Sequence, residues 1–205
     1  MKYGISIALY WEKNVENVLS YKIDSKLDHS LFIVYSHENH SKKVLSDIKG
    51  RNHIIRPNTG ADYGAAKEFF ETKKNEFDRF VFLNDDILFV RNDWLDLFHK
   101  AFEMGADVVS PCVCMNHSKK KIPRGCYWSA TSKFLQELPW PEPMTKNDSY
   151  EQEMNLLPTY MKKNNKKLFQ VGNGDDLMFV PEYPPRQTEC VYSHLQNGEI
   201  KQCPI

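Results

Sequence analysis

The sequence has no excess of charge of either sign, because 27 lysine and arginine residues balance 27 aspartate and glutamate residues. A chain without a net basic field is not drawn to nucleic acid, so we expect no nucleic-acid partner. Cysteine is scarce as well. The five cysteines are irregularly spaced, which argues against a disulfide framework and favours reduced thiols in a cytosolic-type compartment.

Long apolar runs are missing too. An apolar stretch near the start, residues 4–11, is too short for a secretory leader or for a helix that spans a bilayer. We therefore expect a cytoplasmic protein with no membrane span. A chain of 205 residues can bury one good core, so the expected organisation is a single domain over residues 1–205.

Strand and helix signals alternate through the first half of the chain. Short apolar runs predict buried strands at 5–10, 31–35, 53–56 and 80–83. Amphipathic segments predict helices at 15–23, 41–48 and 62–74, and weaker signals follow for a strand at 87–90, a helix at 94–104 and a strand at 107–113. This order indicates a mostly parallel sheet with right-handed crossovers, which defines an α/β fold class.

The pattern becomes irregular beyond Met115. The prolines between residues 138 and 143 break any regular element. A helix is expected after Asp148 or Ser149, with Ser149 and Gln152 as a possible capping box. Pro158 must either kink this helix or lie in the first turn of a separate one.

The strand predicted at 80–83 ends abruptly in Asn84, Asp85 and Asp86. Ligands in open α/β sheets collect at the carboxyl ends of the strands. Two adjacent carboxylates repel each other unless a cation, a basic group or a proton compensates. Their hard oxygens suit Mg²⁺ or Mn²⁺, which in turn suits the diphosphate of a nucleotide-linked substrate. The alternative is a strand that simply ends in polar turn residues.

A glycine-spaced turn over residues 58–65 opens the third predicted helix. Glycines let the backbone approach a ligand closely, and the start of a helix offers free amides. We expect Asp62 to contact the base or the ribose of a nucleotide and Lys67 to reach a phosphate. Ordinary capping by Asp62 and a solvated Lys67 are the alternative. The predicted nucleotide contacts in this segment are Asn58, Gly60, Asp62 and Lys67.

These features together resemble a GT-A fold glycosyltransferase that uses a sugar nucleotide. The resemblance lies in the strand and helix order, in the Asn-x-Gly-x-Asp-x-Gly turn and in the strand that ends in Asn-Asp-Asp. The last motif is similar to the family's Asp-x-Asp signature, with Asn84 in place of the first Asp and Asp86 matching the second. The size and opening of the chain also resemble the small glycosyltransferase domain encoded by chloroviruses, whose family builds glycans on capsid protein.

The resemblance implies a Rossmann-like GT-A fold with a nucleotide-binding half at 1–115 and an irregular, acceptor-side half at 116–205. It implies transfer of a sugar from a nucleotide-diphosphate sugar, with a UDP-sugar favoured, to a glycan or glycoprotein acceptor. The reaction would depend on Mn²⁺ or Mg²⁺, and retention of configuration is slightly favoured over inversion.

The resemblance also assigns further site residues. Asn84 would hydrogen-bond the ribose, and Asp85 would lie against the nucleotide or the metal. Asp86, with Asp85 and His194, would hold the ion, although His194 could equally be a surface histidine. Tyr10, at the end of the first strand, would stack on the base, and core packing is the alternative for its ring.

An acidic residue in the second half is needed for the transfer step. Inverting transfer uses a general base near the acceptor hydroxyl, whereas retaining transfer uses a group that stabilises positive charge on the sugar. Helix capping is the alternative for Glu151, and a plain turn for the two aspartates. The catalytic candidates are Glu151, Glu153, Asp175 and Asp176.

Two other function classes stay open from the sequence. A sugar-phosphate nucleotidyltransferase also combines a Rossmann-like half with acidic metal ligands, but it normally carries a glycine- and arginine-rich loop after the first strand. Residues 11–15 here read Trp-Glu-Lys-Asn-Val. A glycan-binding domain without turnover is the third class. Zinc binding by Cys112, Cys114 and Cys126 is disfavoured, because their spacing fits no familiar finger.

Overall fold

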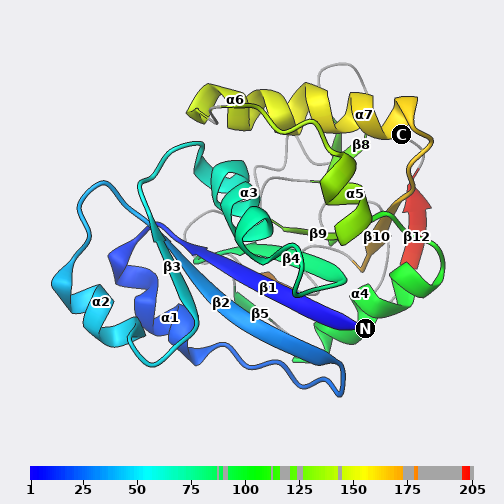
Figure 1. Cartoon of the computed structure of the whole chain (residues 1–205). Helices are drawn as coiled ribbons and strands as arrows, with labels where there is room; N and C mark the ends of the chain where they lie inside the picture. The colour runs from blue at the N-terminus through cyan, green and yellow to red at the C-terminus, as the bar shows by residue number, and fades with distance from the viewer. Residues whose placement is uncertain are drawn as a thin grey trace.

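The computed structural model describes residues 1–86, 88–89, 92–111, 113–115, 121–123, 127–142, 145–172, 178–179 and 200–203. Its main element is a sheet of eight strands in the order β12-β10-β6-β9-β4-β1-β2-β3 (Figure 1). The strands of this sheet are β1 (Lys2–Leu9), β2 (Asp28–Ser36), β3 (His53–Arg56), β4 (Arg79–Asn84), β6 (Val108–Ser110), β9 (Trp128–Thr131), β10 (Leu168–Val171) and β12 (Ile200–Cys203).

Two short antiparallel pairs lie outside the main sheet. They are β5 (Leu88–Phe89) with β11 (Met178–Phe179), and β7 (Val113–Met115) with β8 (Lys121–Pro123). The helices are η1 (Glu12–Asn14), α1 (Val15–Ser20), α2 (Lys42–Ile48), α3 (Ala61–Lys73), α4 (Trp94–Glu103), α5 (Ser132–Glu137), α6 (Lys146–Glu151), η2 (Gln152–Leu156) and α7 (Leu157–Lys163).

The strands β3, β2, β1 and β4 run parallel to one another, as the sequence predicts. Ile7 lies opposite Leu83 of β4 on one side and Ile33 of β2 on the other. Ala8 lies opposite Asn84. The carboxyl ends of β1 and β4 therefore meet at one edge of the sheet, which is where the acidic motif begins.

The sequence pattern did not reveal β9, which runs antiparallel between β4 and β6. Its four residues, Trp-Ser-Ala-Thr, show neither a long apolar run nor a clear alternation. The fifth strand is also shorter than the predicted 107–113, because β6 ends at Ser110 and the chain then enters the separate hairpin of β7 and β8.

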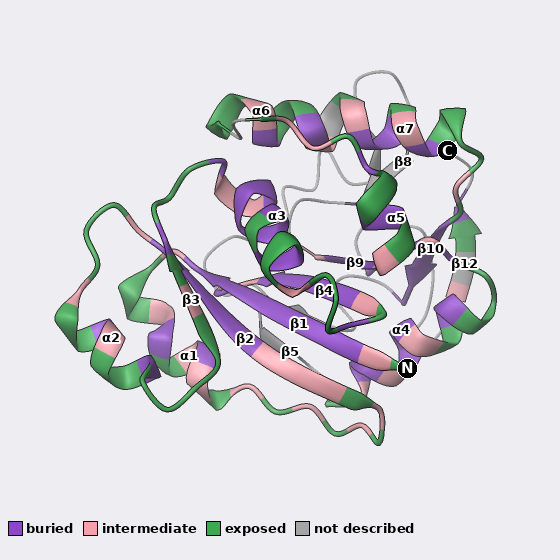
Figure 2. Cartoon of the chain, in the orientation of Figure 1, coloured by how far each residue is buried: buried purple, intermediate pink, exposed green. Residues whose placement is uncertain are grey.

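Both faces of the sheet are covered by helices. α1, α2 and α4 contribute to one buried cluster, and α3, α5 and α7 contribute to the other. β1 lies between them and is buried along nearly its whole length (Figure 2). A strand buried on both faces reads as a continuous apolar run, which explains why β1 and β4 were easy to predict. Among the described residues, no helix is long and apolar enough to cross a membrane.

The helical segment α6–η2–α7 begins earlier than expected. Its capping box is formed by Thr145 and Asp148: the Thr145 hydroxyl accepts from the Asp148 amide (3.2 Å), and the Asp148 carboxylate accepts from the Thr145 amide (2.8 Å). The predicted box of Ser149 and Gln152 is wrong, because Thr145 already supplies the cap one turn earlier. Pro158 lies in the first turn of α7, directly after the π-helical η2. Proline lacks the amide for a regular helical bond, so a change in the hydrogen-bond ladder is expected here.

A polar side chain is buried at the start of the π-helical turn. Gln152 is 0% exposed, and its amide nitrogen and oxygen form no hydrogen bond with the part of the chain that the structure describes. Leaving a buried polar group unsatisfied costs about 1–3 kcal/mol. Glutamine at this position therefore lowers the stability of the folded protein.

Replacing Gln152 by methionine, which has a similar length and no hydrogen-bonding amide, should therefore stabilise the protein. We expect Gln152→Met to raise the free energy of unfolding by about 1–3 kcal/mol. Urea denaturation measures this. Gln136→Met on the exposed face of α5 is the matched control, with an expected change within about 0.5 kcal/mol. A destabilised Gln152→Met would show that the amide is satisfied in solution.

Candidate functional site

The two segments singled out in the sequence meet at the carboxyl edge of the sheet. β4 ends at Asn84, and α3 starts from the turn that follows β3. The Asn84 side-chain nitrogen donates to the Asp62 carboxylate over 3.3 Å. The strand-end motif and the glycine-spaced turn therefore contact each other directly, although 22 positions separate them in the chain.

The glycines of the turn are required by the backbone. Gly60 is the N-cap of α3 and has a left-handed φ of 71°, and Ala61 after it also has a positive φ of 41°. At Gly64 a Cβ atom would overlap the carbonyl oxygen of Thr59. Asp62 is thus not the N-cap, as the capping alternative supposed, but a residue of the first turn whose side chain faces Asn84. A left-handed non-glycine residue such as Ala61 stores strain of the kind found at functional sites.

Arg56 stabilises the turn, and the sequence pattern did not identify it as a site residue. Its side chain is 3% exposed. The guanidinium donates to the carbonyl oxygen of Thr59 (2.5 Å) and to the hydroxyl of Ser36 (3.1 Å), and it pairs with Glu68 (3.5 Å). One buried cation thereby connects β2, β3, the turn and α3. A charged residue at the end of an apolar strand was the feature of the sequence that could have indicated this role.

Asp85 is almost completely buried, at 1% exposure. One carboxylate oxygen accepts from the backbone amides of Tyr10 (2.8 Å) and Trp11 (2.7 Å). Burial raises the pKa of the Asp85 carboxyl to about 6; the two amide bonds lower it in part, and the charge of Asp86 adds to the rise. The side chain fastens the end of β1 to the end of β4. Its roles as a metal or nucleotide ligand stay predictions.

Asn84 and Asp86 are both partly buried. The side-chain oxygen of Asn84 is buried, and no described residue donates to it. Within the described ranges, no group of three or more His, Cys, Asp or Glu residues is placed to hold a metal ion. His194, the predicted further ligand, lies outside the described residues.

A cavity of about 580 Å³ opens beside the turn. Lys67 is 6% exposed there, and its ammonium group donates to the carbonyl oxygen of Pro141 (2.8 Å) and bonds the Glu142 carboxylate. In the structure the ammonium group of Lys67 contacts residues 141 and 142. Its contact with a phosphate stays a prediction. The cavity is lined by Arg56, Asn58, Thr59, Gly60, Gly64, Lys67, Glu68, Glu71, Glu142, Thr145 and Lys146. The three basic side chains of this lining are balanced by three acidic ones.

Tyr10 and Trp11 differ in exposure at the end of β1. The Tyr10 ring is partly buried and packs against the cluster under α3, which fits the core-packing alternative for this residue. Trp11 is 59% exposed. Base stacking by Tyr10 stays a prediction, and the neighbouring indole presents the more accessible ring.

The catalytic candidates divide by location. Glu151 is exposed and accepts a hydrogen bond from Asn155 (2.8 Å), whereas Glu153 is partly buried on η2. Asp175 and Asp176 lie outside the described residues. The Ser149 hydroxyl accepts from the Tyr63 amide (3.4 Å), which ties α6 to the first turn of α3 (Figure 1). This bond brings the segment that carries the two glutamates to the same edge as Asp62.

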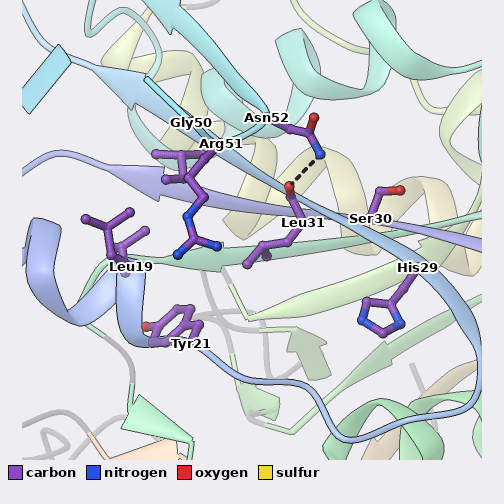
Figure 3. Close-up of a pocket in the computed structure, with 10 residues that line it drawn as sticks. Leu19, Tyr21, His29, Ser30, Leu31, Gly50, Arg51 and Asn52 are labelled. Carbon is purple, nitrogen blue, oxygen red and sulfur yellow. Dashed lines mark hydrogen bonds between the residues drawn. The ribbon is translucent and has the colours of Figure 1, made fainter. Parts of the chain in front are cut away.

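A second hollow, of about 390 Å³, contains none of the predicted site residues. It lies beside the first half of β2 and the residues that precede β3 (Figure 3). There the Asn52 side chain donates to the Leu31 carbonyl oxygen over 3.3 Å and closes one wall. Its labelled lining residues are Leu19, Tyr21, His29, Ser30, Leu31, Gly50, Arg51 and Asn52.

Comparison with known proteins gives a likeness in structure only. No family model and no curated protein sequence matches the chain. TarS of S. aureus has a TM-score of 0.50 and 12% identity over 73% of this chain and 32% of TarS. A cytidylyltransferase from Leptospira borgpetersenii has a TM-score of 0.47 and 17% identity over 80% of this chain and 72% of its own. A protein from Desulfovibrio desulfuricans, predicted to be a nucleotide-diphospho-sugar transferase, has a TM-score of 0.46 and 13% identity over 83% and 80%.

At these identities the likeness shows the fold. The chain has a Rossmann-like α/β fold that it shares with TarS, and this confirms the predicted fold class. The chain spans about a third of the length of TarS, so nothing of that protein's activity is carried over with the fold.

The close packing of Gly64 against Thr59 leads to a first site prediction. Gly64→Ala should lower the free energy of unfolding by about 3 kcal/mol, although alanine normally favours a helix, because a backbone carbonyl cannot move aside cheaply. Gly50→Ala is the control, since a Cβ there meets nothing within 4 Å. Chemical denaturation should show an effect within about 0.5 kcal/mol for that control. Equal effects of the two variants would contradict the packing.

The hydrogen bonds that the Asp85 carboxylate accepts from two backbone amides lead to a second site prediction. Asp85→Ala leaves both buried amides without an acceptor and should cost about 3 kcal/mol of stability. Asp85→Asn keeps one carbonyl oxygen in reach of the amides, so it should cost about 1 kcal/mol or less. Thermal and urea unfolding of both variants decide this. The interpretation is wrong if the asparagine variant is as unstable as the alanine variant.

Proposed function

We propose that the protein is a glycosyltransferase that moves a sugar from a nucleotide-diphosphate sugar, with a UDP-sugar as the favoured donor, to a glycan or glycoprotein acceptor. The observation that carries the proposal is the contact of Asn84 with Asp62 at the carboxyl edge of the sheet. It joins an acidic strand end to a glycine-spaced helix start at the place where α/β folds bind nucleotides. The α/β fold that the chain shares with TarS supplies this edge.

The residues at the edge fit a divalent cation in part. Asp86 offers carboxylate oxygens, and Asn84 offers a buried amide oxygen to which no described residue donates; both are hard ligands that suit Mn²⁺ or Mg²⁺. Asp86 is the favoured ligand because the carboxylate of Asp85 is engaged by two backbone amides. His194 or Asp85 would complete the shell. When bound, the cation would neutralise the charge on the departing diphosphate.

The nucleotide would lie between the end of β1 and the turn before α3. Asn58 and Gly60 line the neighbouring cavity, and Asp62 points at the end of β4. Tyr10 or Trp11 would take the base by stacking. The acceptor would enter from the side of α6, where Glu151 and Glu153 are the described catalytic candidates, with Asp175 and Asp176 as the others.

The test is calorimetric binding of UDP with Mn²⁺ and again with EDTA. The native protein should bind UDP at least about tenfold more tightly with Mn²⁺, and Asp86→Asn should remove this difference by removing a charged ligand. Asp47→Asn on the exposed face of α2 is the control and should keep the difference.

Equal UDP affinity of the native protein with Mn²⁺ and with EDTA would rule out the role of the metal. Failure to bind UDP under both conditions would rule out the proposed donor. Slow hydrolysis of UDP-glucose or another UDP-sugar in the presence of Mn²⁺ would separate an enzyme from a binding domain of the same fold.

A further inference from the structure

We propose that Asp62 is a positioning residue: its carboxylate sets the orientation of the Asn84 amide so that the amide oxygen, not the nitrogen, faces the bound nucleotide. This inference rests on the proposed function and assigns within it a role that differs from direct contact of Asp62 with the base or ribose. The evidence is the hydrogen bond between the two side chains and the state of the remaining Asn84 atom.

The chemistry of the carboxylate decides which way the amide points. An ionised carboxylate can only accept hydrogen bonds, whereas an amide has a donating nitrogen and an accepting oxygen that look alike in shape. The Asn84 atom that lies 3.3 Å from the Asp62 oxygen must therefore be the nitrogen. The amide oxygen is consequently forced to the other side.

That oxygen is left with an unmet requirement. It is buried, and no described residue donates a hydrogen bond to it. A buried acceptor without a donor is unfavourable by about 1–3 kcal/mol, and a ligand that supplies an electropositive group removes this penalty. A hydroxyl hydrogen or a cation can do so, whereas a phosphate oxygen, being an acceptor, cannot. The arrangement thus selects a nucleoside hydroxyl or a metal ion for this position.

Asp62 is held firmly enough to act in this way. Its backbone follows two residues with left-handed φ angles, Gly60 at 71° and Ala61 at 41°. The next residue, Tyr63, donates its amide to Ser149 of α6 (3.4 Å). These contacts fix the backbone of the first turn, and the hydrogen bond to Asn84 then fixes the two side chains relative to each other.

The pairing also gives a physical reason for asparagine at position 84. An aspartate there would place two carboxylates within about the same 3.3 Å, and like charges at that distance oppose each other. An acid on α3 and an amide on β4 keep the hydrogen bond and avoid the repulsion. Exchanging the two residues should therefore preserve the pair. The amide introduced at position 62 would donate to the carboxylate introduced at position 84, which would still present an accepting oxygen toward the ligand.

The experiment is a double-mutant cycle of Asp62→Asn, Asn84→Asp and the exchange variant that carries both, with UDP affinity measured in Mn²⁺ and in EDTA. We expect Asn84→Asp to weaken UDP binding on the order of tenfold, and Asp62→Asn to weaken it less, because an amide pair can bond in either orientation. The exchange variant, whose net charge equals that of the native protein, should recover to within about threefold of native affinity.

The outcomes separate the possible meanings. A coupling that persists in EDTA assigns the Asn84 oxygen to a nucleoside hydroxyl, and one that appears only with Mn²⁺ assigns it to the cation; both support positioning by Asp62. Losses that simply add in the exchange variant would overturn it, because the two side chains would then act independently.

A purely structural role is distinguished by melting temperature. If the single variants lower the melting temperature, the exchange variant restores it, and UDP affinity is native in all three, then the pair supports only the fold and the positioning role is refuted. The native protein is measured first. If it binds no UDP with or without Mn²⁺, the proposed function itself fails, a result that the variants cannot imitate.

Discussion

The buried carboxylate of Asp85 is the constraint on which the candidate site depends. It accepts the amides of Tyr10 and Trp11 at 2.8 and 2.7 Å and so fixes the end of β1 against the end of β4. Its environment disfavours the charged form, which raises its pKa to about 6 mainly through burial. Burial of the acid is unfavourable by itself, and the two amide hydrogen bonds offset this cost while they hold the strand ends together.

The three polar residues at the end of β4 consequently have different roles. Asn84 bonds to Asp62 across the edge, Asp85 turns inward to the backbone, and Asp86 follows as the carboxylate proposed for the cation. Asn84 is the last residue of β4, whereas Asp85 and Asp86 lie in the turn that follows it, so neighbours in sequence need not share a role. The side chains of Asn84 and Asp85 make different contacts, and the charge of Asp86 still adds to the raised pKa of Asp85.

Local strain and an unsatisfied group lie together at this edge. Ala61 has a left-handed backbone, and no described residue donates to the Asn84 oxygen. Ser149 of α6 bonds to the start of α3 beside them. Sequences that favour one fold usually avoid such conflicts, and the exceptions concentrate where binding or catalysis requires them.

The sequence by itself determined the parallel α/β core, because strands buried on both faces give continuous apolar runs such as those of β1 and β4. It also determined that the glycine-spaced turn and the strand-end acids belong to one edge, since parallel strands share an orientation. Short β9 escaped because four mixed residues carry no period. Only the tertiary structure decided that Asp62 faces Asn84, that Asp85 serves the backbone and that Lys67 is directed to Pro141 and Glu142. Side-chain direction is set by neighbours distant in sequence, which a local pattern does not contain.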